Sequence, residues 1–129
     1  MLSLDFIAGL IAGEGAFMWI KQNNTEVAVF QLKMHALEKP LFELIKETLG
    51  LKEKIHQYLH QNRHYVLLLV RKRSVVEEII IPTFEGRLFG LKKIQFEDWK
   101  NKFFERKRYY LYKKYNKPPS SNLVVTKRI

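Results

Sequence analysis

A single carboxylate stands where a helix is predicted to end. Apolar and small residues from Leu2 to Gly13 predict a short helix, and Glu14 follows it directly. Because the C-terminal end of a helix carries partial negative charge, a carboxylate added there attracts cations. Two such carboxylates placed side by side around a two-fold axis would favour divalent metal ions over two unpaired charges. We therefore predict a metal site at Glu14 and Gly13.

The same helix is rich in small residues. Glycines and alanines at spacings of three and four let a helix pack backbone to backbone against a symmetry mate. The alternative is ordinary tight packing within one chain, with Glu14 merely facing solvent at a helix end. The first interpretation predicts a dimer interface formed by Phe6, Ala8, Gly9, Ala12 and Gly13.

Two β-hairpins are predicted to follow. Apolar residues alternate at Phe17 and Trp19 and again from Ala28 to Met34, with the turn-forming pair Asn23-Asn24 between them. A second hairpin is predicted from β-rich segments at residues 55–61 and 65–72, joined by a loop at residues 61–64.

Three further helices complete the chain. The apolar spacing from Leu37 to Leu49, followed by Gly50, predicts a helix between the hairpins. Ser74 and Glu77 form a capping-box pattern that predicts a short helix ended by Pro82. A long amphipathic pattern predicts a last helix at residues 91–115, and the basic residues 117–129 are expected to form a flexible tail after a domain of residues 1–116.

The predicted order is α-β-β-α-β-β-α-α, which defines an α+β fold. A four-stranded antiparallel sheet with helices on one face fits this order. The other face of such a sheet is free to lie against a partner.

Composition indicates which partners suit this chain. The 129 residues carry a formal net charge of +10, which draws polyanions such as nucleic acids and would also suit an anionic membrane or an acidic protein. The chain has no cysteine, which excludes disulfides, a thiol nucleophile and Cys-ligated zinc. No run of about 20 apolar residues exists, so we expect a soluble intracellular protein without a membrane partner, in the nucleoid or an organelle matrix.

Residues 7–15 carry a family resemblance. The run Ile7-Ala8-Gly9-Leu10-Ile11-Ala12-Gly13-Glu14-Gly15 resembles the LAGLIDADG motif of homing endonucleases, with the second acidic position on Glu14 and the first replaced by Ala12. The resemblance implies a saddle-shaped αββαββα(α) domain and a metal-dependent enzyme that cuts double-stranded DNA. With one copy of the motif, it also implies a homodimer acting on a long, roughly palindromic target in intron homing. The metal it implies is Mg²⁺, with Mn²⁺ or Ca²⁺ able to occupy the site.

The resemblance also assigns roles near the motif. Lys92 matches a family lysine near the cleaved phosphates, where it would polarise the phosphate or orient the attacking water. The family often places a glutamine that holds water at the end of the second strand, where this chain has Met34. Since methionine cannot do this, Gln31 or His35 are the alternatives.

DNA contacts are predicted from the period of two along each strand. His56 and His60 are about 13 Å apart on a strand, too far to share a zinc ion, so contact with bases or phosphates is preferred. Basic residues nearby can hold phosphates, although charge runs are most often solvated surface. The predicted set is Met18, Ile20, Gln22, Thr25, Val27, Val29, Gln31, Lys33, His56, Tyr58, His60, Arg63, Arg71 and Lys93.

Two other functions remain open from the residues. Ala12 and Met34 leave room for a non-catalytic binder on the same fold, such as an RNA-splicing maturase. A structural or regulatory DNA-binding module, in which Glu14 is only a helix-end residue, is the third interpretation.

Overall fold

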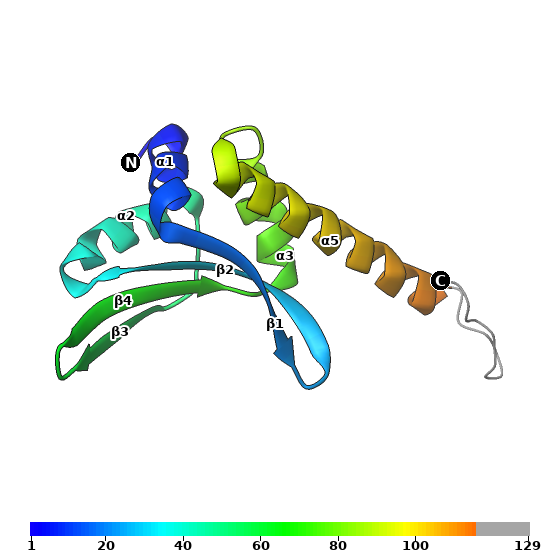
Figure 1. Ribbon diagram of the computed structural model, residues 1–129, viewed down its shortest axis with the longest axis horizontal. Coiled ribbons are helices and arrows are strands. Elements are labelled where there is room, and N and C mark those ends of the chain that lie inside the picture. The colour runs from blue at the N-terminus through cyan, green and yellow to red at the C-terminus, as the bar shows by residue number, and fades with distance from the viewer. Residues whose placement is uncertain (116–129) are drawn as a thin grey trace.

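The computed structural model describes residues 1–115 and is built on one antiparallel sheet. The strand order is β1-β2-β4-β3, and every neighbouring pair is antiparallel. The sheet arches, with helices on its convex side and its concave side uncovered (Figure 1). The predicted α+β class, with helices on one face, is confirmed. The strands are β1 (Gly15–Gln22), β2 (Thr25–His35), β3 (Ile55–His60) and β4 (Arg63–Val70).

Both hairpins have two-residue loops. In the first, Asn23 and Asn24 have φ values of 51° and 65°, the left-handed pair that matches the twist of a hairpin, and the predicted turn is confirmed. In the second, His60 pairs with Arg63, so the predicted loop at residues 61–64 is wrong. Arg63 and His64 are exposed and polar, so the apolar pattern did not reveal that they continue the strand.

The first two major helices agree with the sequence. Helix α1 (Leu4–Glu14) begins after Ser3, whose hydroxyl accepts a hydrogen bond from the Phe6 N–H. A 3-10 turn, η1 (Ala36–Glu38), precedes α2 (Lys39–Leu49), which ends at Gly50 with a φ of 74°. The predicted helix between the hairpins is confirmed.

The next helical run departs from the expectation. It comprises α3 (Arg73–Val75), the π-helix η2 (Val76–Ile80) and α4 (Ile81–Phe84). No side-chain cap forms at its start, which follows Lys72, so the predicted capping box is wrong. Pro82 does not end the run either, because the wider π turn before it places the proline in the first turn of α4, where its ring is tolerated.

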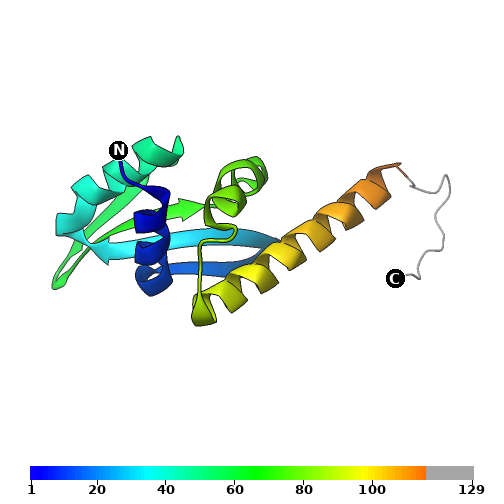
Figure 2. The same cartoon turned by 90° about the horizontal axis from the view of Figure 1, so that it is seen from above.

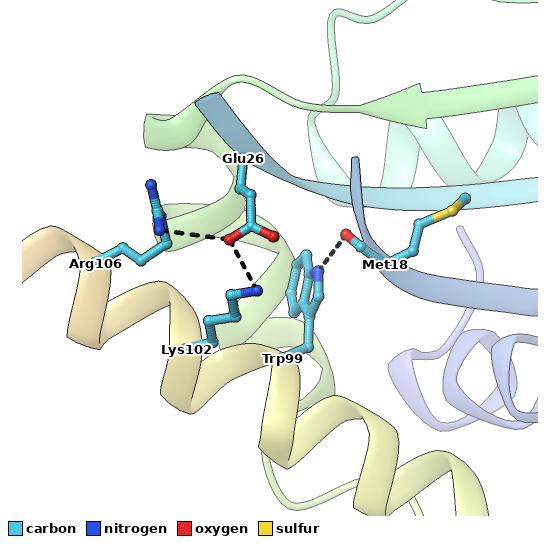
Figure 3. A network of polar contacts seen from close by, with 5 residues as sticks. All are labelled: Met18, Glu26, Trp99, Lys102 and Arg106. Carbon is cyan, nitrogen blue, oxygen red and sulfur yellow. Dashed lines mark hydrogen bonds and ion pairs between the residues drawn. The ribbon is translucent and has the colours of Figure 1, made fainter. Parts of the chain in front are cut away.

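The long helix α5 (Gly90–Tyr115) is confirmed and completes the core. Phe17 lies at the centre of an aromatic cluster, with ring centroids 5.1 Å from both Phe96 and Trp99 and 5.6 Å from Phe84. The indole N–H of Trp99 donates to the Met18 carbonyl at 2.9 Å and fastens α5 to β1 (Figure 3). Beyond this core α5 projects past the end of the sheet (Figures 1 and 2).

Two expectations concern other regions. Among the described residues, no helix is long and apolar enough to cross a membrane. The predicted tail at residues 117–129 lies outside the described part of the chain.

Candidate active site and nucleic-acid interface

Glu14 is the last residue of α1 and is exposed where the helix meets β1. The junction depends on Gly15, because a Cβ added there would lie 2.6 Å from Cγ2 of Ile11. Gly15 is buried, and its backbone is extended rather than helical. The chain can therefore leave the helix directly into the edge strand, which holds the Glu14 carboxylate at the junction.

Lys92 reaches this junction from the first turn of α5. Its ammonium group donates a hydrogen bond to the Gly15 carbonyl oxygen at 2.6 Å. The two residues are 77 positions apart in sequence, and the lysine is half-buried. The fold thus brings a cation to the peptide that follows Glu14. The neighbouring Lys93 is exposed.

The donor set at the end of α1 suits a hard cation only in part. A carboxylate and the carbonyl groups of a helix end are oxygen ligands, the type that Mg²⁺ and Ca²⁺ prefer. Within the described residues, however, no three His, Asp or Glu side chains gather to hold a metal ion. The described residues of one protomer therefore do not by themselves supply three such side chains around a metal ion.

The residues considered for holding water lie in different environments. Gln31 is on the concave face of β2 and pairs with Ala16 of β1. Ala16 lies two residues after Glu14 in the sequence. The Nδ1 atom of His35 accepts a hydrogen bond from the Leu37 N–H at 3.0 Å and caps η1. Met34 packs against the core. Of the two alternatives, His35 therefore has one ring nitrogen already used in capping η1.

The strand register places the predicted DNA-facing side chains on one face. Cross-strand partners in an antiparallel sheet point to the same side. Met18 pairs with Val29 and Ile20 with Val27, while Lys33 pairs with Leu67. On the outer strands the partners are His56 with Leu67, Tyr58 with Tyr65 and His60 with Arg63. This common side is the uncovered concave face of the sheet (Figure 1).

Sequence reasoning missed three residues of this face. Tyr65, Leu67 and Leu69 of β4 point the same way as Lys33 and Gln31, their partners or neighbours on β2. Both faces of β4 carry apolar residues, so its sequence shows no alternation between apolar and polar positions. A cross-strand argument from the second strand would have found them.

One member of the predicted set is not accessible. Val29 lies on the concave face but is only 2% exposed, because neighbouring side chains cover it. Its assignment as a DNA contact is therefore corrected. Gln22 and Thr25 are exposed at the first hairpin, and Arg71 is exposed just after β4.

Stacked groups occupy the outer part of the face. The rings of Tyr58 and Tyr65 stack with centroids 4.8 Å apart. The Lys33 ammonium lies 4.6 Å from the centroid of the Tyr65 ring. These contacts hold a positive charge on the concave face.

Two glycines, Gly9 and Gly13, lie on the exposed side of α1. A Cβ added at Gly9 or at Gly13 would meet nothing within 4 Å, and Phe6 is 50% exposed. Ala12 is also exposed. Ala8, in contrast, is 2% exposed and packs in the protomer core, so its assignment to a dimer interface is wrong. A helix turns by 100° per residue, and Ala8 falls on the same side as the core residues of α1.

A polar cluster ties the first hairpin to α5. The Glu26 carboxylate lies 3.1 Å from the Lys102 ammonium and 3.5 Å from the Arg106 guanidinium (Figure 3). The hydrogen bond from Lys102, with the positive charges nearby, lowers the pKa of Glu26. The cluster restrains the hairpin, one end of the concave face, against the helix.

These features define an αββαββα domain with a carboxylate-ended helix beside an open antiparallel sheet. The chain belongs to the LAGLIDADG endonuclease family, whose pattern matches residues 7–103. No curated protein sequence matches it.

Solved structures with this fold include I-SmaMI bound to uncleavable DNA, at 23% identity and a TM-score of 0.74, matching 84% of this chain and 38% of that one. I-GzeII in complex with its DNA target matches at 24% identity and a TM-score of 0.72, again over 84% and 38% of the two chains. The homing endonuclease I-TnaI matches at 20% identity and a TM-score of 0.72, over 83% of this chain and 75% of its own. This chain thus spans less than half the length of the first two proteins.

Proposed function

We propose that the chain is a site-specific endonuclease that cuts double-stranded DNA as a homodimer with divalent metal ions, most suitably Mg²⁺. The observation that carries the proposal is the contact of Lys92 with the Gly15 carbonyl, beside the carboxylate at the end of α1. This contact brings a cation to the residue that follows Glu14, at the edge of the sheet. The family match favours this activity over RNA splicing.

The proposed dimer is supported by what one protomer lacks. It presents one carboxylate at the end of α1, and its described residues hold no metal-binding cluster. Gly9 and Gly13 are exposed, and no described atom of the protomer would lie within 4 Å of a Cβ added at either position. Packing α1 against a second α1 would use the glycines and bring two Glu14 carboxylates together. A two-fold dimer implies a long target with approximate two-fold symmetry.

Each side chain would have a separate task in cleavage. The proposed reaction is hydrolysis: water attacks phosphorus and loses a proton, one P–O ester bond breaks, and the leaving oxygen takes up a proton to become a hydroxyl group. Divalent ions bound by Glu14 would stabilise the charge on the attacking and leaving oxygens. Lys92 would place its positive charge toward the phosphate. Gln31, on the adjoining strand, is proposed to orient the attacking water.

DNA would lie against the concave face. The polar and cationic groups of the hairpins, among them Gln22, Lys33 and Arg63, are suited to base edges and phosphates. Ile20 and Val27 near the middle are suited to thymine methyl groups. The net charge of +10 would add long-range attraction.

The test is cleavage of duplexes selected from a random library with Mg²⁺ present and absent. On a selected site we expect Glu14→Gln to abolish cleavage and to leave DNA binding nearly unchanged, because the substitution removes charge but keeps shape. Glu43→Gln, an exposed change on α2, is the matched control and should cut normally. Cleavage by Glu14→Gln at the wild-type rate would contradict the metal assignment.

A further inference from the structure

A pocket of about 210 Å³ lies outside the proposed cleavage site, where β2 runs beyond the end of β4. Pairing between these strands starts at Phe30, so residues 25–28 have β1 on one side and no strand on the other within the described chain. Three segments close the space: this edge of β2, the start of α3 and the middle of α5. The lining residues used below are Trp19, Val27, Arg71, Arg73, Arg106 and Lys107.

The pocket gathers positive charge from distant parts of the sequence. Four cationic side chains line it, and Glu26 is the acidic residue of the lining. Glu26 is already bound by Lys102 and Arg106, and Lys107 is bound by Glu77. With the partners Lys102 and Glu77 included, five cations face two carboxylates. The site therefore has a net positive charge that favours binding of an anion.

Two further observations indicate an acceptor-bearing ligand. The indole N–H of Trp19, a lining residue, is buried and has no hydrogen-bond partner among the described residues. A buried donor without an acceptor is costly, and an anionic oxygen would remove that cost. The Arg73 guanidinium lies 4.4 Å from the centroid of the Tyr110 ring, which restrains it at the pocket.

The size and the walls of the pocket narrow the class of ligand. Its volume of about 210 Å³ is far larger than the space that a single water molecule needs. Val27, Ala28 and Phe103 supply apolar wall beside the cations. A bare anion would leave this wall without a contact, whereas a sugar attached to the anion would cover it.

We propose that this pocket binds a phosphate group carried on a sugar. Arg71 and Arg73 provide the charge, and Trp19 donates its indole N–H. The phosphate comes either from the backbone of the bound duplex or from a free nucleotide. The first source rests on the proposed function, because it requires DNA on the concave face that Val27 borders.

The first experiment titrates the full chain with inorganic phosphate and with a nucleoside monophosphate at constant ionic strength, followed by calorimetry. We expect saturable binding that is tighter for the nucleotide and is weakened at least tenfold in Arg73→Gln. Trp19→Phe, which keeps the ring wall but removes the N–H, should weaken binding several-fold. Lys52→Gln, an exposed change after α2, is the matched control and should bind like the wild type.

The second experiment distinguishes the two sources. If the duplex supplies the phosphate, nucleotide should compete with DNA at constant ionic strength, and Arg73→Gln should lower the salt slope of DNA binding by about one unit. Saturable nucleotide binding without competition assigns the site to a free nucleotide. Lys39→Gln, an exposed change on α2, should leave the slope unchanged.

The proposal is overturned if neither phosphate nor nucleotide binds saturably and Arg73→Gln keeps the wild-type salt slope. Cleavage by the wild type in the same preparation would show that the proposed function stands while the pocket assignment fails. Nucleotide binding without any DNA binding would show the reverse.

Discussion

Replacing the exposed glycines of α1 with alanine should have opposite effects on folding and on association. Gly9 and Gly13 lie inside the helix, and an added Cβ meets nothing within 4 Å of the protomer. Alanine is favoured over glycine in a helix interior by about 1 kcal/mol. Gly9→Ala and Gly13→Ala should therefore each stabilise an isolated protomer by up to that amount.

Association should weaken in the same variants. If two copies of α1 pack backbone to backbone, each added methyl group enters the interface twice because of the two-fold symmetry. With about 1 kcal/mol as the lower cost of one overpacked contact, the dimer loses ~2 kcal/mol, roughly a thirtyfold rise in its dissociation constant. Gly15→Ala is the internal comparison, because its Cβ would lie 2.6 Å from Cγ2 of Ile11 and should destabilise the protomer instead.

The assay combines sedimentation equilibrium with urea unfolding at several protein concentrations. For a folded dimer the unfolding midpoint rises with concentration. In Gly9→Ala we expect a higher midpoint at the lowest concentration and a weaker dependence on concentration. A variant that dimerises as tightly as the wild type would refute the packing of α1 against a second α1, whatever its effect on the protomer.

Three further outcomes test the core, the hairpin cluster and the DNA face. Phe84→Ala should cost about 3–5 kcal/mol in urea unfolding, since the ring is fully buried against three other aromatic rings; a loss below ~1 kcal/mol would contradict the packing. The lowered pKa of Glu26 means that its ion pairs stabilise the fold above its ordinary value of 4.5 and that this contribution is lost as pH falls below it. Wild type should therefore lose more stability than Glu26→Gln when unfolding midpoints are compared across that range, and parallel curves would disprove the assignment. Lys33→Gln should lower the salt slope of DNA binding by about one unit, and an unchanged slope would place Lys33 away from the backbone.

The fold was predictable wherever one physical signal dominated. The pair Asn23-Asn24 tolerates the left-handed backbone of a tight hairpin, and Gly50 ends α2 in the same conformation. Errors occurred where tertiary packing overrode local chemistry. Ser74 forms no cap, and Pro82 is accommodated by a π turn whose spacing no local pattern indicates.

The candidate site was predictable only as separate residues. Glu14 was found from its place at a helix end, and Lys92 was placed by resemblance to a family. The contact of Lys92 with Gly15, next to Glu14, depends on how α5 packs against a segment 77 positions earlier in the sequence, which no local pattern contains. The burial of Ala8 and Val29 was not predicted for a related reason. The period of a helix or strand shows which residues share a face, but it does not show which other parts of the chain cover that face.

In the proposed dimer, the position of Glu14 would link assembly to catalysis. Gly13 and Glu14 are consecutive residues of one helix, so a second protomer that approaches the glycine stripe also brings its carboxylate to the same place. Two carboxylates close together without a cation repel one another, whereas a divalent ion between them removes that repulsion. Metal binding and association would therefore each strengthen the other, as linkage requires. Under the proposed function, a single short helix would in this way leave the cutting chemistry incomplete in the lone protomer and complete it only when two copies meet on DNA.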